Sequence, residues 1–115
     1  MEKNVRISIL CELYGKMLTD RQYACLDDYY NNDLSLSEIA ENNNITRQAV
    51  RDVIKQGENN LFELEENIGF MRKIQNQEKQ IKNILEELDK TEKCILDENV
   101  KNDLKNIKNE IKKLI

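Results

Sequence analysis

The chain has 115 residues and a formal net charge of −4, and it contains three glycines, no proline and no histidine. A chain of this length forms one domain, or one small domain with an appendage. The scarcity of turn formers and aromatic residues predicts an all-α protein, and the absence of histidine and of a glycine-rich phosphate loop argues against an enzyme, a cofactor or a metal site.

The amino-terminal stretch predicts a first helix. Apolar residues between residues 4 and 18 recur at intervals of three and four, as on one face of a helix. Charges interrupt this apolar pattern, so the stretch is neither a signal peptide nor a membrane span. The cysteines, Cys11, Cys25 and Cys94, are widely spaced, which predicts reduced thiols that pack helices in a cytoplasmic protein without membrane insertion.

A second helix is predicted to begin after Thr19. Thr19 and Gln22 have the spacing of a capping box, in which each side chain pairs with the backbone amide of the other residue. The helix ends with Tyr29 and Tyr30. These rings can stack on bases, but the favoured interpretation is that one of them packs against the first helix with its hydroxyl at the rim.

The stretch LSLSEIAENNNITRQAVRDVIKQ, residues 34–56, has the pattern of a helix-turn-helix unit. A second capping box at residues 35–38 predicts a short helix, and Ala40 is small enough for the point where two helices cross. Asn44 tolerates the left-handed backbone that the turn needs, and Thr46 is a good N-cap for the next helix. The apolar residues expected to hold that helix from behind are Ile39, Ile45, Val50 and Val53.

The second helix of this unit presents a polar face, which we predict to bind nucleic acid. The candidate binding residues are Thr46, Arg47, Gln48, Arg51 and Lys55. Arg and Gln can bind guanine and adenine edges in bidentate fashion, while Thr46 and Lys55 can reach phosphates. Charges over residues 36–56 sum to zero, so a local patch must provide the attraction. The alternative interpretation is an amphipathic helix whose solvent face happens to hold two Arg and one Lys.

After Gly57 the pattern changes, which divides the chain into a predicted helix-turn-helix domain at residues 1–57 and a helical tail at residues 58–115. Asp97 is a candidate N-cap, so the tail is expected to be two helices that fold back, with one continuous helix as the weaker alternative. Two heptad-like series are expected to be buried against each other, against the first helix, or against a partner or another copy of the chain; the last arrangement would give a homodimer through the tail. They are Ile74, Ile81, Leu88 and Ile95, and Val100, Leu104, Ile107, Ile111 and Leu114.

Pairs of adjacent carboxylates, Glu65–Glu66 and Glu86–Glu87, are the nearest the chain comes to an acid–base site. Neighbouring residues on a helix point about 100° apart, so the two carboxylates of a pair do not converge on one substrate. Both pairs are therefore interpreted as solvated faces.

The segment from MLTDRQ through YYNNDLSLSEIAE to TRQAVRDVIKQGENNL resembles region four of bacterial sigma factors and, more closely, the YlxM family of small Gram-positive proteins. The family is expected to carry LLT..Q, YY..D.SL.EIAE and SRQAV.D.IKR.E..L in these places. The likeness covers residues 4–75, and the tail matches only in character. It implies an all-α, sigma region-four-like helix-turn-helix with a helical C-terminal tail.

The resemblance also implies a function. YlxM proteins are associated with the signal recognition particle pathway, chiefly through gene proximity, so the implied role is regulatory or accessory. The implied partners are DNA, the particle's RNA or a protein component of the particle. The family's binding helix corresponds to Thr46, Arg47, Gln48, Arg51 and Lys55. Gln56 stands where the family has a basic residue, and Gly57 follows it, which weakens phosphate binding at that end. The alternative function is a protein-interaction adapter that binds no nucleic acid.

Overall fold

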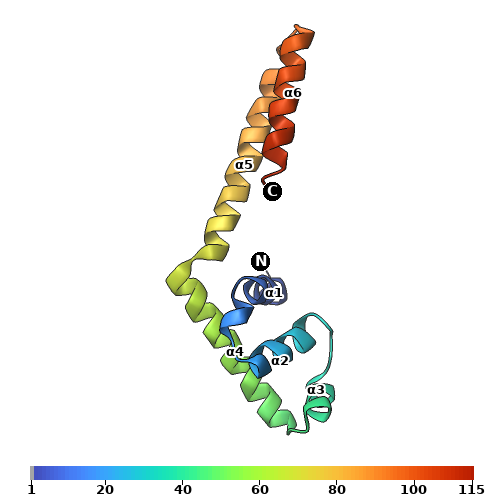
Figure 1. Ribbon diagram of the computed structural model, residues 1–115, viewed down its shortest axis with the longest axis vertical. Coiled ribbons are helices and arrows are strands. Elements are labelled where there is room, and N and C mark those ends of the chain that lie inside the picture. The colour runs from blue at the N-terminus through green and yellow to red at the C-terminus, as the bar shows by residue number, and fades with distance from the viewer. Residues whose placement is uncertain (1) are drawn as a thin grey trace. The chain divides into compact units, whose positions relative to one another are not determined.

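The computed structural model describes residues 2–115, and within that range every regular element is a helix (Figure 1). This confirms the predicted all-α fold. The elements are α1 (Lys3–Tyr14), a 3-10 turn (Gly15–Met17), α2 (Asp20–Tyr30), α3 (Leu36–Asn43), α4 (Arg47–Ile68), α5 (Phe70–Glu92) and α6 (Glu98–Lys112). They form two compact units, Met1–Met71 and Arg72–Ile115. Among the described residues no helix is long and apolar enough to cross a membrane.

Side-chain caps begin three of the helices in the first unit, as the sequence predicted. In the box before α2, the Gln22 amide donates to Thr19 Oγ1 at 3.1 Å, and the Thr19 amide donates to Gln22 Oε1 at 3.3 Å. The box before α3 has the same two bonds between Ser35 and Glu38. Thr46 Oγ1 accepts from the Ala49 amide at 3.0 Å and caps α4. These local bonds satisfy the amides that a helix start leaves open.

The turn between α3 and α4 uses Asn44 where glycine is more common. Asn44 adopts a left-handed backbone, with φ 55° and ψ 40°, and ends α3. The following amide, of Ile45, donates to the Ala40 carbonyl at 3.1 Å. Ala40, Ile39 and Val50 are buried behind this turn, so the steep approach of α4 to α3 is held by small and aliphatic side chains, as predicted.

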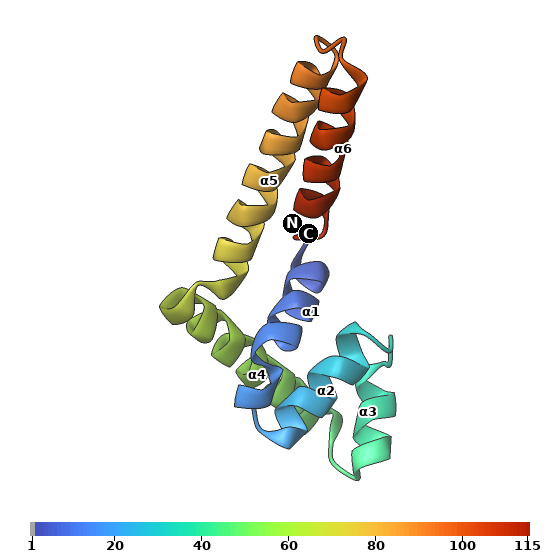
Figure 2. The same cartoon turned by 45° about the horizontal axis from the view of Figure 1, so that its top comes forward.

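Helix α4 is the spine of the first unit, and α1, α2 and α3 all pack against it (Figures 1 and 2). The core between them is almost entirely aliphatic, with Tyr14 as its one buried aromatic ring among the described residues. Its fully buried members are Ile7, Leu10, Tyr14, Cys25, Leu26, Ile39, Val50 and Leu61. This core fixes the orientation of the first half of α4, which carries the predicted binding residues.

Helix α4 passes through Gly57 without interruption, although glycine disfavours helix interiors. A Cβ at residue 57 would stand 2.8 Å from Leu26 Cδ1, on the facing helix α2. Any larger residue there would force the buried Leu26 side chain to shift, so glycine suits the close approach of α2 and α4. The change of pattern at Gly57 does not mark the end of a helix. The first compact unit extends to Met71, beyond the predicted boundary at residue 57.

A buried polar group joins the end of α4 to the start of α5. Gly69, with φ 73°, ends α4, and the chain turns directly into Phe70. Glu65 is only 6% exposed; its Oε1 accepts from the Tyr14 hydroxyl at 2.8 Å and from the Met71 amide at 2.9 Å. The Phe70 amide donates to the Tyr14 hydroxyl at 3.1 Å. The interpretation of Glu65 as a solvated carboxylate was therefore wrong, whereas its neighbour Glu66 is exposed.

The second unit is an antiparallel pair of helices, α5 and α6, lying side by side (Figures 1 and 2). Asp97 caps α6 as predicted, accepting from the Asn99 and Val100 amides at 2.8 and 3.2 Å. Lys108 on α6 reaches across to α5, where it donates to Glu92 at 2.6 Å and pairs with Asp89. This contact holds the pKa of Asp89 below its ordinary value. No residue from Arg72 to Ile115 is fully buried.

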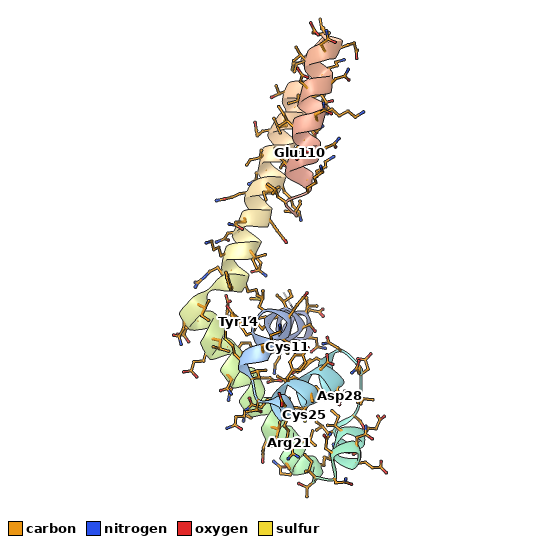
Figure 3. All side chains as sticks on the ribbon, in the orientation of Figure 1. Cys11, Tyr14, Arg21, Cys25, Asp28 and Glu110 are labelled. Carbon is orange, nitrogen blue, oxygen red and sulfur yellow. The ribbon has the colours of Figure 1, made fainter. Side chains whose placement is uncertain are left out.

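The three cysteines are free thiols in different surroundings. Cys11 on α1 and Cys25 on α2 are buried in the first unit (Figure 3), as predicted for thiols that pack helices. Cys94 is exposed beyond the end of α5, so that prediction was wrong for this residue. Burial, with a smaller contribution from Asp27, raises the pKa of the Cys11 thiol from 9.0 to about 11.

We expect the folded first unit to lose stability as the pH rises from 9 to about 11, because the unfolded Cys11 thiol ionises over this range while the folded one stays protonated. Below pH 9 both states keep the proton, and this contribution is fully present. Urea unfolding at stepped pH measures the effect. Burial raises the pKa of Cys25, Tyr14 and Tyr30 as well, so Cys11→Ala should make the pH dependence shallower without abolishing it, whereas Cys94→Ala should leave it unchanged. Equal slopes in all three proteins would contradict the assignment.

Candidate nucleic-acid interface

Three of the predicted binding residues form a cationic row on the first half of α4. Arg47, Arg51 and Lys55 follow one another at intervals of four residues, which places them on one face over about 12 Å of helix. All three are exposed, and none forms a salt bridge with any residue that the structure describes. The row therefore offers unpaired positive charge on an otherwise acidic chain.

The other two predicted residues, Gln48 and Thr46, are already engaged within α4. Gln48 Nε2 donates to Asp52 Oδ1 at 3.0 Å, one turn further along and beside the row. The Thr46 hydroxyl oxygen accepts from the Ala49 amide as the N-cap, and its proton can still be donated to a phosphate. The structure thus brings Arg47, Arg51 and Lys55 together and sets Gln48 and Thr46 apart from them.

The row forms one wall of a groove of about 470 Å³. Tyr29 and Tyr30 at the end of α2 also line this groove, and Lys3 at the start of α1 adds a further cation. Lys3 was not predicted to belong to the site, because it lies 44 residues before Arg47 and no local pattern connects them. Tyr29 and Tyr30 had been considered for base stacking, but the sequence did not indicate that they line the same groove as the arginines.

The cationic row lies near the amino-terminal end of α4, and this location also favours binding of anions. Arg47 and Arg51 lie in the first two turns of a 22-residue helix whose first turn contains no acidic residue. The amino-terminal end of a helix carries partial positive charge from its aligned peptide dipoles. A phosphate beside these arginines would therefore experience attraction from both the side chains and the helix end.

The sequence of residues 1–103 matches the family described as "UPF0122: Putative helix-turn-helix protein, YlxM / p13 like". The chain is 44% identical to the UPF0122 protein of Clostridium kluyveri over 89 residues, which cover 77% of this chain and 80% of that protein. It is 41% identical to the UPF0122 protein of Listeria monocytogenes over 108 residues, or 94% and 96% of the two chains. The relative from Malacoplasma penetrans is 47% identical over 92 residues, with 76% and 86% covered. The family match reaches well beyond residues 4–75, into α6.

Proposed function

The chain belongs to the family of YlxM- and p13-like helix-turn-helix proteins, and we propose that it is a regulatory or accessory protein that binds nucleic acid through α4. The proposal rests on the row of Arg47, Arg51 and Lys55. The opposite face of α4 packs in the buried aliphatic core, so the row is exposed, and its members form no salt bridge with any residue that the structure describes. Charged side chains without an internal partner are suited to neutralising phosphates.

The proposed target is the RNA of the signal recognition particle, with a protein component of the particle as a neighbouring partner and DNA as the other nucleic acid to be tested. This target rests on the association of YlxM proteins with that pathway. Because the chain has a net charge of −4, its overall field repels phosphate, so a nucleic acid must be attracted by the cationic row itself. Modest affinity with a strong dependence on salt is therefore expected.

Fluorescence anisotropy of the full chain with the particle RNA and with random duplex DNA tests the proposal. If the row neutralises three phosphates of a duplex, log K should fall with log salt with a slope of about −2.7. Arg51→Ala should weaken binding to both probes and reduce the steepness by about one unit. The matched control is Arg21→Ala, which removes an exposed arginine of α2 that does not line the groove. Absence of binding at low salt, or equal losses in the two variants, would overturn the proposal.

A second candidate function, protein binding by the α5–α6 pair, is favoured by an apolar flank that this pair leaves uncovered. The residues directed between the two helices are only partly buried, and four further apolar side chains remain 46–71% exposed: Ile84, Val100, Ile107 and Leu114. The contact of Lys108 with Asp89 and Glu92 links the two helices. Val100, Ile107 and Leu114 are spaced by seven, so they form one stripe.

A second copy of the chain is the proposed partner for this flank. Residues 72–115 carry 11 basic and 9 acidic residues, so two copies would repel one another little. A 44-residue helical pair without a fully buried side chain has little core of its own, and pairing with another copy would supply one. Sedimentation of the full chain at increasing concentration tests this, since a constant monomer mass would exclude a homodimer through the tail.

A further inference from the structure

The groove beside α4 is lined by both aromatic and cationic side chains, and its two tyrosines are held by contacts within the protein. Tyr29 is 38% exposed, and its ring meets Tyr30 edge to face, with centroids 5.0 Å apart and planes at 86°. The Tyr30 hydroxyl donates to Glu58 on α4. Burial, and then this bond, raises the pKa of Tyr30 above the ordinary tyrosine value, which already lies well above neutral pH, so the hydroxyl is protonated and can donate. Tyr29 thus lies against a ring that is anchored at its far end.

The charge within the groove is strongly positive. Of the residues that line it, Lys3, Arg47, Arg51 and Lys55 are cationic, and Glu58 is the one carboxylate among these described lining residues. The Glu58 side chain is only 12% exposed, accepts from Tyr30, and pairs with Lys3 at 3.3 Å. Its charge is therefore compensated within the protein, and the arginines are left to face a ligand.

An exposed tyrosine ring in the same groove as two arginines is suited to one particular form of nucleic acid. Within a regular duplex each base is stacked between its neighbours, so a protein ring cannot reach its face. An unpaired base can leave the stack and lie on an aromatic ring while its flanking phosphates contact Arg or Lys. The volume of about 470 Å³ lies in the range of sites that hold small organic ligands.

We propose that this groove binds an unpaired nucleotide, with its base stacked on Tyr29 and its flanking phosphates on Arg47 and Arg51. The inference rests on the proposed nucleic-acid-binding function and specifies its substrate class: a strand with at least one unpaired base, from a single strand or a loop. Arg47 and Arg51 recognise the phosphates of any nucleic acid, whereas Tyr29 distinguishes unpaired from paired segments. RNA and DNA share this chemistry, so both are included in the test.

The test measures anisotropy of the full chain with labelled oligothymidine, with oligouridine, and with oligothymidine annealed to oligoadenine. Tyr29→Ala should weaken binding of the two single strands about tenfold, within the range found when stacking residues are truncated, and should leave duplex binding unchanged. Tyr29→Phe keeps the ring and should bind all three probes like the wild type. Tyr23→Ala, which removes another exposed tyrosine of α2 outside this groove, is the matched control.

The outcomes separate this inference from the function on which it rests. If Tyr29→Ala has no effect, or weakens duplex and single-strand binding equally, while Arg51→Ala weakens both, the unpaired-nucleotide site is overturned and nucleic-acid binding stands. If none of the probes binds at low salt, both proposals are overturned. Equal losses in Tyr29→Ala and Tyr23→Ala would likewise overturn the site, since the effect would not depend on the groove.

Discussion

Glu65→Ala is expected to lower the free energy of unfolding of the first unit by about 3 kcal/mol. The substitution removes the oxygen that accepts from the Tyr14 hydroxyl and the Met71 amide, both part of the buried network where α4 meets α5. Donors left unpaired in a buried site each cost about 1–3 kcal/mol. All four tyrosines lie within residues 1–71, so the tyrosine signal during urea unfolding reports on this unit.

Two substitutions serve as controls for the Glu65 experiment. Glu65→Gln keeps an acceptor oxygen of similar reach and should lose less than half as much stability as Glu65→Ala. Glu66→Ala removes the exposed carboxylate of the next residue and should stay within about 0.5 kcal/mol of the wild type. Equal destabilisation by Glu65→Ala and Glu66→Ala would show that the buried acceptor contributes nothing.

Features determined by neighbouring residues were predictable from the sequence. The capping boxes, the left-handed Asn44 and the caps at Thr46 and Asp97 each depend on a side chain and backbone groups within a few residues. Such interactions are the same in any fold, so the pattern alone locates the helix starts and the turn of the helix-turn-helix. The aliphatic residues behind the turn followed from helical periodicity.

Features determined by distant residues were not predictable. The change of pattern after Gly57 was interpreted as a domain boundary, yet this glycine lies inside α4, where Leu26 of α2 occupies the space that a side chain would fill. Glu65 reads as solvated because its donor Tyr14 is 51 residues away in the sequence. The groove is a further case: Lys3, Tyr29 and Arg51 come from three helices, and only the folded core brings them to one place.

Within the candidate site on α4, too, one feature was predictable from the sequence and another was not. Sequence spacing placed Arg47, Arg51 and Lys55 on one helical face, and the structure agrees. The sequence did not indicate that the Gln48 side chain would donate to Asp52. An exposed Gln at this position would equally suit an amide directed at a base edge. That these residues bind nucleic acid stays a prediction, based on their exposure and charge.

Leu88→Asp is expected to unfold the α5–α6 pair while leaving the first unit folded. Leu88 lies in the seam between the helices and is partly buried, and the substitution replaces its apolar contact with a charge, at a cost of about 2 kcal/mol or more. A helical pair without a fully buried side chain has little stability to lose. The helical circular dichroism should fall substantially, since α5 and α6 contribute 23 and 15 helical residues.

The same substitution tests the proposed homodimer, because a chain that pairs through the α5–α6 flank requires that seam to be folded. Leu88→Asp should sediment as a monomer and keep its affinity for oligonucleotides, since α4 lies in a unit whose core contains no residue of the seam. Asn83→Asp introduces the same charge at an exposed position of α5 and should change neither helicity nor mass. If Leu88→Asp changes neither helicity nor mass, and Arg47→Ala alone dissociates a dimer, then α4 is the surface for self-association. The roles assigned to α4 and to the α5–α6 flank would then be reversed.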